Sequence, residues 1–536
     1  MTIPEPATTA ESPPLVIEPH RRFSESRLWA WQRAFFERRG AAAWNEAQVP
    51  HYITSNPAMA AAYARLIAGF LRDWRTALDP DQPVYLLELG GGSGRFAYHL
   101  LTRLHDLLER TPLRGLRVVY VLSDAAPAVI EAWRAHPWLQ PLVAEGRLDF
   151  ALFDAAAPAP LRLLSSGLTL TPETCANPLV ALANYVFDSI PQDLFAVQGG
   201  QLSECLAALT LPEPPAEPDD PALLGRVGIA IERRLATKPC YDDPHWNSIL
   251  AGYRERLGDA VLAFPCAALG CLRFLHHLAG GRLLLLSADK GYRSEDEIEG
   301  RQEPALALHG SFSMSVNYHA IGAYARLLGG AVLQTSHQPA HLHVVGLLFG
   351  QPPDGSGETE LAYYEAVERG GPDDFFALKK GIEPHYAALS LAQILAYLRL
   401  SGWDSNIFWG CLPSLLARAA EADAGLRAEL CAAAAHVWAG YFPIGEADDL
   451  AFHIGMLLYA LGAYPQALRY WQYSLRLYGP HPSTTYNLAM TAYQLHQREV
   501  ALTYLEQTLA LHPTFAEARA MRIAIESERA RLAHRV

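Results

Sequence analysis

Four features are missing from this sequence of 536 residues, and each absence narrows the class of protein. No apolar run reaches the roughly 20 residues that a membrane-spanning helix requires. The amino-terminal stretch is rich in Pro, Ala and Thr and lacks the basic start and apolar core of a signal peptide. No long basic block occurs, and the formal net charge is −13, which disfavours sequence-independent nucleic-acid binding. We therefore expect a soluble, cytoplasmic protein that binds neither membrane nor nucleic acid.

Paired metal ligands are also missing. The seven cysteines are scattered and form no C-x-x-C pair, which suits reduced thiols in a reducing compartment. His341 and His343 alternate along an expected strand near His337, but no cysteine lies close to them in the sequence. We interpret these histidines as a surface face and predict no metal site.

The apolar content is 50%, which is enough for several hydrophobic cores, and the length favours two to four domains. We expect a flexible amino-terminal tail over residues 1–22, followed by amphipathic helices over 24–44 and 57–78. Apolar runs then alternate with helical stretches, which predicts an α/β domain with a mostly parallel, Rossmann-like sheet. The expected strands lie at 85–88, 116–122, 148–153, 179–183, 283–286, 331–333 and 344–348.

The first of these strands ends in a carboxylate and continues into the glycine-rich run Glu88-Leu89-Gly90-Gly91-Gly92-Ser93-Gly94-Arg95. A glycine turn between a strand and a helix exposes backbone N–H groups at the positive end of that helix, so it predicts a site for a nucleotide-like ligand. Dinucleotide-binding turns have a third small residue where Arg95 stands here. The spacing is E-x-G-x-G-x-G instead, with Gly90, Gly92 and Gly94 as the glycines.

Polar residues end or follow five of the expected strands. Ligands of parallel sheets bind outside the carboxyl ends of the strands, so these side chains are candidates for a common site. Asp124 is placed to accept both hydroxyls of a ribose, and Asp154, with Phe153 as a face for the ring, to accept from an adenine amino group. Each residue alone is equally well explained as a turn or cap residue. The five are Glu88, Asp124, Asp154, Asn184 and Asp289.

The glycine run resembles motif I of class I S-adenosylmethionine-dependent methyltransferases. Residues 183–191, Ala-Asn-Tyr-Val-Phe-Asp-Ser-Ile-Pro, are similar to the A-N-E-x-x-D-A-x-P signature of MidA-like methyltransferases, whose mitochondrial members methylate arginine in a respiratory complex I subunit. Segments 51–57, 123–127, 289–292 and 315–320 also resemble this family, in the same order along the chain. The resemblance implies S-adenosylmethionine as cofactor and a cofactor site that uses Glu88, Gly90, Gly92, Gly94, Asp124, Phe153, Asp154 and Asn184.

Two positions depart from the family pattern. Tyr185 replaces the signature glutamate, and Asn317 replaces an aspartate before Tyr318. Arginine methylation needs carboxylates that hold the guanidinium, so their loss weakens the case for an arginine acceptor while leaving it open.

Three residues are candidates for the base that takes a proton from the acceptor: Asp188, Asp289 and His319. Asp188 is also explained as a helix cap beside Pro191. We therefore predict a methyltransferase that acts on a protein side chain, and keep as the alternative a scaffold that binds the cofactor without turnover.

Two further regions flank or interrupt this domain. An insertion at about 206–262 contains Tyr241–Trp246, which is interpreted either as part of a lid or as a surface turn. The methyltransferase domain is expected over 23–356, a helical connector over 357–445, and tetratricopeptide-like repeats with a capping helix over 446–536.

The repeat assignment rests on a period of about 34 residues. Its consensus positions are Gly455, Leu458, Gly462, Tyr464, Ala467 and Trp471, then Ala489, Ala492, Ala501 and Leu505. Such repeats usually bind a protein, here a substrate or partner, and are also compatible with docking or homodimer formation.

Overall fold

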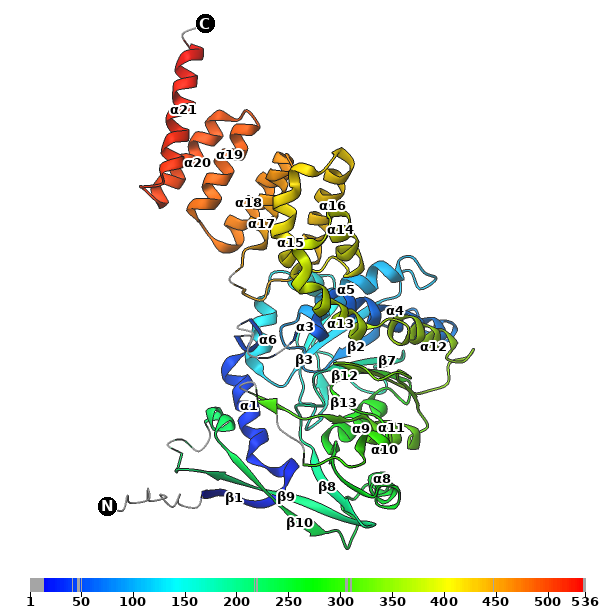
Figure 1. The fold of residues 1–536 in the computed structure, drawn as a ribbon. Coiled ribbons are helices and arrows are strands. Elements are labelled where there is room, and N and C mark those ends of the chain that lie inside the picture. Colours follow the sequence, from blue (N-terminus) through cyan, green and yellow to red (C-terminus); the bar gives the residue numbers. More distant parts are fainter. Residues whose placement is uncertain are drawn as a thin grey trace, which may run out of the picture. The chain divides into compact units, whose positions relative to one another are not determined.

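The computed structural model describes residues 14–40, 42–45, 49, 51–215, 217, 220–303, 307–308, 311–446 and 448–533. The chain forms two compact units that divide between Asp374 and Phe375 (Figure 1). Each unit has its own hydrophobic core. The first unit is mixed α/β, and the second is helical.

A seven-stranded sheet organises the first unit. Its order is β17-β18-β12-β7-β2-β3-β4, and all neighbours are parallel except that β18 runs antiparallel to both β12 and β17. The mostly parallel sheet predicted from the alternation of apolar runs is therefore confirmed. The strands are β2 (Val84–Glu88), β3 (Val118–Asp124), β4 (Leu148–Leu152), β7 (Leu179–Asn184), β12 (Leu283–Asp289), β17 (Ala331–Leu333) and β18 (His343–Leu348).

The order of the strands reverses beside β2. The chain passes from β2 to β3 and β4 on one side, and then returns to β7 on the other side. Open α/β sheets bind ligands outside the carboxyl ends of the strands at such a switch point, because the connections there diverge to opposite sides. In this chain the switch point lies where β2 enters the glycine turn before α5 (Arg95–Leu108).

A second, antiparallel sheet is built from the insertion and the amino-terminal segment. It contains β1 (Leu15–Arg22), β8 (Asp193–Gln198), β9 (Gln201–Leu211), β10 (Gly228–Leu235) and β11 (Asp259–Phe264). The insertion therefore begins at about residue 193 and not at 206.

The predicted amino-terminal tail is wrong for residues 15–22. This segment pairs with β9, with Leu15 opposite Leu211 and Arg22 opposite Leu206. The segment forms a strand because its backbone groups hydrogen-bond to β9, which is distant in the sequence. Residues 1–13 of the predicted tail lie outside the described residues.

The first predicted helix is divided in two. α1 (Arg27–Arg39) ends at Gly40, which has φ +49°, and α2 (Ala42–Asn45) follows. A short helix, α3 (Tyr52–Ser55), precedes α4 (Pro57–Asp73), which starts at the cap residue Asn56.

The predicted domain boundary at residue 356 is also wrong. α12 (Gly357–Tyr363) packs on α4, because buried Asp73 accepts the backbone N–H groups of Glu358 (3.0 Å) and Thr359 (2.8 Å). An ideal Cβ on Gly69 of α4 would lie 2.7 Å from the carbonyl oxygen of Glu358. The two helices therefore touch backbone to backbone, and residues 357–374 belong to the first unit.

The second unit consists of antiparallel helical pairs. In the pair α17–α18, Gly455 lets the Trp471 indole approach within 2.5 Å of where a Cβ would stand, and in α19–α20 Ala489, Ala492 and Ala501 are fully buried. Small residues at these positions match the predicted packing, while the assignment to tetratricopeptide repeats stays a prediction. The helices are α14 (Leu391–Leu400), α15 (Ser405–Arg418), α16 (Ala424–Gly440), α17 (Leu450–Ala460), α18 (Tyr464–Tyr478), α19 (Pro482–Gln494), α20 (Arg498–Leu511) and α21 (Ala516–Ala533).

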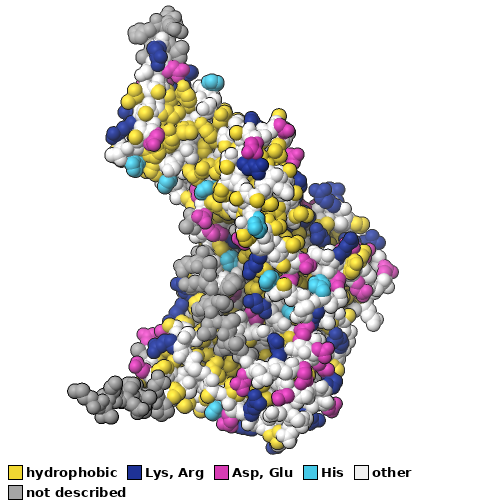
Figure 2. Space-filling view, in the orientation of Figure 1, with side chains coloured by type: hydrophobic (Ala, Val, Ile, Leu, Met, Phe, Trp, Pro, Cys, Tyr) yellow, Lys and Arg dark blue, Asp and Glu magenta, His cyan; other side chains and the backbone are white. Residues whose placement is uncertain are grey.

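Hydrophobic side chains gather on the visible face of this unit in Figure 2, and Leu400 is 79% exposed. Among the helices of the described chain, none combines the length and apolarity needed to cross a bilayer.

Substitution of Asp73 tests the boundary of the first unit. We expect Asp73→Ala to lower the free energy of unfolding of this unit by about 2 kcal/mol, because a buried cap that accepts two backbone N–H groups is lost. Exposed Asp106 on α5 provides the control, and Asp106→Ala is expected to change stability by less than about 0.5 kcal/mol. Chemical denaturation monitored by tryptophan fluorescence measures both, and equal stability of the two variants would contradict the packing of α12 on α4.

Candidate functional site

The glycine turn is fixed by hydrogen bonds to the strands on both sides of β2. Leu89 N–H donates to Leu182 of β7, and Gly91 N–H donates to Ser123 of β3, both at 2.9 Å. Gly90, Gly92 and Gly94 have φ of +57°, +54° and +77°, a region that other residues rarely adopt. The turn therefore exposes bare backbone in one fixed shape above the carboxyl ends of three strands.

Glu88 lies at the base of this turn and is buried. Its carboxylate accepts a 2.8 Å hydrogen bond from the Tyr120 hydroxyl. Burial raises the pKa of Glu88 to about 8, and the nearby charge of Asp124 acts in the same direction. A carboxyl that is neutral near pH 7 can donate a hydrogen bond as well as accept one.

Asp124 ends β3 and borders a cavity of about 490 Å³. It accepts N–H bonds from Gly92 (3.4 Å) and Ala126 (3.0 Å), and burial raises its pKa to about 6. The carboxylate thus links the glycine turn to the loop after β3. This places the residue predicted to bind ribose hydroxyls at the cavity wall.

Two adjoining cavities, of about 490 and 90 Å³, lie over the turn. They share Phe36, Trp44, Gly90 and Tyr185 as lining residues. The smaller cavity is also lined by Glu88, Gly92 and Asn184 of the predicted cofactor site. The larger cavity is also lined by the predicted residues Asp124, Phe153 and Asp154. Gly94 lines neither cavity, since it packs against Trp133 where α5 begins.

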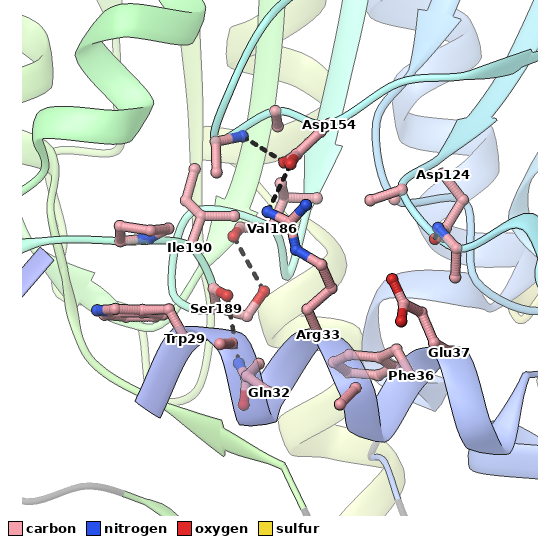
Figure 3. A pocket seen from close by; sticks show the side chains of 18 of the residues that line it. Trp29, Gln32, Arg33, Phe36, Glu37, Asp124, Asp154, Val186, Ser189 and Ile190 are labelled. Atoms are coloured by element: carbon pink, nitrogen blue, oxygen red, sulfur yellow. Dashed lines mark hydrogen bonds and ion pairs between the residues drawn. The ribbon is translucent and has the colours of Figure 1, made fainter. Parts of the chain in front are cut away.

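Asp154 already has a partner inside the larger cavity. Figure 3 shows Arg33 extending from α1 to its carboxylate, with Arg33 Nη2 and Asp154 Oδ2 2.6 Å apart. The other oxygen, Oδ1, accepts from Ala156 N–H at 2.9 Å. Arg33 therefore occupies one of the positions from which an adenine amino group could donate to this carboxylate. The ring of Phe153 lies beside Phe274, with 5.6 Å between ring centroids.

Asn184 ends β7 opposite the glycine turn and lines the smaller cavity. Its Oδ1 accepts a 2.8 Å hydrogen bond from the Tyr63 hydroxyl of α4. Its Nδ2 is buried and has no hydrogen-bond partner among the described residues. An unsatisfied buried donor beside a cavity points to a ligand acceptor atom, because leaving such a group unpaired is costly.

Tyr185 lines both cavities and has an unusual backbone conformation. Its φ of +53° is rare for a bulky side chain and is usually tolerated only where the surroundings enforce it. Its N–H donates to Ala288 of β12 at 2.9 Å, which holds the strained backbone in place. Burial, with the charges of Asp289 and Asp188, raises the pKa of its hydroxyl. Tyr185, which replaces the glutamate of the signature, thus forms part of the wall of both cavities.

Asp188 and Asp289 interact as a buried pair beside Tyr185, outside the walls of both cavities. Burial raises the pKa of Asp188 to about 6, and burial together with the Asp188 charge raises that of Asp289 further. Neighbouring buried carboxyls favour a state in which they share one proton. No helix of the described chain begins at Asp188, so its interpretation as a helix cap is wrong.

His319 does not join this group. It lies on α11 (Tyr318–Leu327), where Nδ1 is 2.8 Å from the Tyr253 hydroxyl and Nε2 is 3.9 Å from Glu295. Burial lowers its pKa. Asn317 caps the same helix by accepting from Ala320 N–H at 2.9 Å. Both positions lie outside the lining of the two cavities.

One whole side of the cavity is formed by a helix that the sequence motifs do not indicate. α1 contributes Trp29, Arg33, Phe36 and Glu37, which face the strand ends (Figure 3). Their i, i+4, i+7 and i+8 spacing was a usable signal for a second functional face, opposite the buried stripe of Leu28, Trp31 and Phe35. Gln32 anchors this helix by donating to Phe312 O (2.7 Å) and Ser189 O (3.2 Å).

The Tyr241–Trp246 segment is neither a free lid nor a simple surface turn. The Tyr241 hydroxyl donates to Asp193 at 2.5 Å, and Asp243 caps α8 (Pro244–Arg256). The segment is therefore packed against the second sheet. Among the described residues, no group of three or more His, Cys, Asp or Glu side chains is arranged to hold a metal ion.

Comparison with known proteins gives a faint structural likeness. No family model and no curated protein matches the sequence. Two solved structures from Burkholderia thailandensis match at 14% identity. One is an uncharacterized COG1565 superfamily protein with a TM-score of 0.38, covering 71% of this chain and 81% of its own. The other, described as a COG1565 superfamily member and "likely methyl transferase" bound to S-adenosyl-homocysteine, has a TM-score of 0.35 and covers 70% and 88%. At these scores the likeness carries no information about what the present chain binds.

The raised pKa of Glu88 predicts a specific pH dependence of stability. A carboxyl that holds its proton up to about pH 8 in the folded state, but only to about 4.5 when unfolded, stabilises the fold most at low pH. Its contribution declines as the pH rises, by up to about 1.4 kcal/mol per pH unit. We expect Glu88→Gln to remove this part of the slope between pH 6 and 8, with Asp106→Asn as a control that leaves it unchanged. Urea unfolding at several pH values measures it, and parallel curves for wild type and Glu88→Gln would refute the assignment.

Proposed function

We propose that the protein is an S-adenosylmethionine-dependent methyltransferase whose cofactor binds over the glycine turn. The observation that carries the proposal is the turn itself. Its backbone opens onto cavities lined by Glu88, Asp124 and Asn184, at the switch point of a mostly parallel sheet. This sheet and its helical companion region are consistent with a methyltransferase fold.

The residues present fit such a cofactor. The larger cavity, of about 490 Å³, lies within the range that holds small-molecule ligands, and the cavity of about 90 Å³ adjoins it over the turn. Asn184 Nδ2 and a protonated Glu88 offer donors to a carboxylate or carbonyl in the smaller cavity. Asp124 offers an acceptor to ribose hydroxyls, and Phe153 offers a face to an aromatic base, with Asp154 beside it. A Cβ on Gly90 or Gly92 would enter the same space, 3.1 Å from Val186 or 3.0 Å from Trp44.

When bound, S-adenosylmethionine supplies a methyl group on a positively charged sulfur, and transfer requires in-line approach of the acceptor. The chain's own contribution is then chiefly orientation. Asn184 and the glycine turn hold one end of the ligand, α1 covers the other, and Tyr185 defines the passage between the two cavities. Phe36 and Trp44 provide apolar walls that both cavities share.

The scaffold alternative is favoured by one observation. Asp188, Asp289 and His319 line neither cavity, so none of the predicted bases lies at the passage near Tyr185. A fold that retained cofactor binding and lost turnover would have this property. The protein acceptor, the arginine acceptor and recruitment by the helical unit stay predictions of the sequence.

Cofactor binding is tested with S-adenosyl-homocysteine and isothermal titration calorimetry. We expect wild type to bind and Gly90→Val to lose measurable binding, because valine combines an unfavourable φ with a side chain in the cavity. Gly199→Val is the matched control. Gly199 has φ +56°, almost the same strain, and its Cβ would meet nothing within 4 Å. A folded wild type that gives no heat, or equal loss in both variants, would sink the cofactor assignment.

Turnover is tested by incubating the protein with tritium-labelled S-adenosylmethionine and a cell lysate. An enzyme transfers label to a protein or small-molecule fraction, whereas a scaffold transfers none. We expect Asp188→Asn to lower the transfer rate by less than about tenfold, because its carboxyl lies outside the cavity walls. General-base catalysis contributes about 10²–10⁴-fold, so a larger loss with unchanged S-adenosyl-homocysteine affinity would identify Asp188 as the base.

A further inference from the structure

A groove next to the larger cavity is not used by the proposed cofactor. It has a volume of about 690 Å³ and shares Ser24, Ala156 and Pro191 with the larger cavity, so the two spaces adjoin. We call it the α9 groove, after the helix α9 (Cys266–Leu278) that forms one wall. Its lining residues are Ser24, Ala156, Pro158, Pro191, Trp246, Cys266, Ala267, Gly270, Arg273, Phe274 and His277.

The wall formed by α9 contains a glycine, Gly270, that faces open space. Gly270 lies in the middle of this helix, where glycine is less favourable than alanine by about 0.5–1 kcal/mol. A Cβ at Gly270 would have no atom within 4 Å, so no neighbouring side chain requires a glycine there. The missing side chain enlarges the groove. This is expected where a ligand, and not the packing of the protein, needs the room.

The polar groups of the groove favour a negatively charged ligand. Arg273 and His277 lie one turn apart on α9, and no Asp or Glu is among the described residues that line the groove. Asp243, behind the wall, is 3.2 Å from Arg273 Nη1 and holds the guanidinium over the Trp246 ring, 5.8 Å from its centroid. Since a guanidinium carries five N–H donors, the Asp243 contact leaves donors for a ligand carboxylate. A guanidinium or ammonium ligand would have no carboxylate among these lining residues to pair with.

The apolar surfaces of the groove come from two aromatic residues and two prolines. Trp246 and Phe274 present ring surfaces, and Pro158 and Pro191 present flat aliphatic ones. Phe274 also contacts Phe153 of the larger cavity, which joins the two binding spaces through a pair of rings. Aromatic walls with a fixed cation at one side match a planar ring that bears an acidic group.

We propose that the α9 groove binds the methyl acceptor and that this acceptor is an aromatic carboxylic acid. The inference rests on the proposed methyltransferase function. The acid group lies against Arg273 and His277, and the ring lies between Trp246 and Phe274. The group to be methylated then extends past Pro191 toward the larger cavity. The chemistry differs from that of an arginine acceptor, which needs carboxylates where the lining of this groove has Arg273 and His277.

The test uses ligand-observed NMR with benzoate, 4-hydroxycinnamate and indole-3-acetate, each paired with its neutral carboxamide, on the full-length protein. We expect at least one acid to bind the wild-type protein, and its carboxamide to compete with it only weakly. The affinity for that acid should fall tenfold or more in Arg273→Gln. Arg254→Gln, an exposed arginine on α8 outside the groove, is the control and should keep wild-type affinity.

Gly270→Leu separates the groove from the cofactor site. Because a Cβ there meets open space, the variant should fold and bind S-adenosyl-homocysteine as wild type does, yet lose acid binding. Gly270→Ala adds one methyl group and should retain most of it. Acid binding that survives Gly270→Leu, or no binding of any acid to a protein that binds S-adenosyl-homocysteine, overturns the groove assignment and leaves the methyltransferase proposal intact. Failure of wild type to bind S-adenosyl-homocysteine contradicts the methyltransferase proposal itself.

Discussion

The hydrogen bonds that hold the glycine turn between β3 and β7 are the constraint on which the rest of the site depends. Leu89 and Gly91 donate to strands on opposite sides of β2, so the turn can move only if the sheet opens. This rigidity lets Glu88, Asp124 and Asn184 converge from three different strands on one small volume. The order of the strands, more than any single side chain, therefore creates the site.

This arrangement buries four carboxyl groups, which is unfavourable when they are charged. Glu88, Asp124, Asp188 and Asp289 all have raised pKa values, chiefly because the sheet edge excludes water. Natural folds keep such groups where they serve binding or proton transfer, since neutral residues pack more favourably. The strained Tyr185 lies beside two of these acids and beside both cavities. Strain and buried charge thus coincide at the passage where the proposed methyl transfer takes place.

Local pattern was sufficient to predict the sheet and the glycine turn. The strands of the large sheet are mostly apolar runs, and the five parallel ones end at or within two residues of an acidic or amide residue, so their positions and their common edge follow from the sequence. It was insufficient where a partner is distant in the chain. β1 is a strand only because β9 lies beside it, and α12 joins the first unit only because Asp73 caps it. The role of α1 was missed because its cavity face mixes Trp29 and Phe36 with Arg33 and Glu37, as an ordinary exposed helix face does, and only tertiary structure shows that it covers the cavity.

The ion pair between Arg33 and Asp154 connects α1 to the proposed cofactor site. Both groups line the larger cavity, and Arg33 is 52% exposed, so the pair is weakly held and open to exchange. A ligand that hydrogen-bonds Asp154 releases the guanidinium, which stays on α1 within the same cavity. Arg33 then joins Arg273 as a second cation on the path between the cofactor site and the α9 groove. The larger cavity and the adjoining α9 groove therefore each contain one arginine, Arg33 and Arg273, while Glu37 is an acidic residue that also lines the larger cavity.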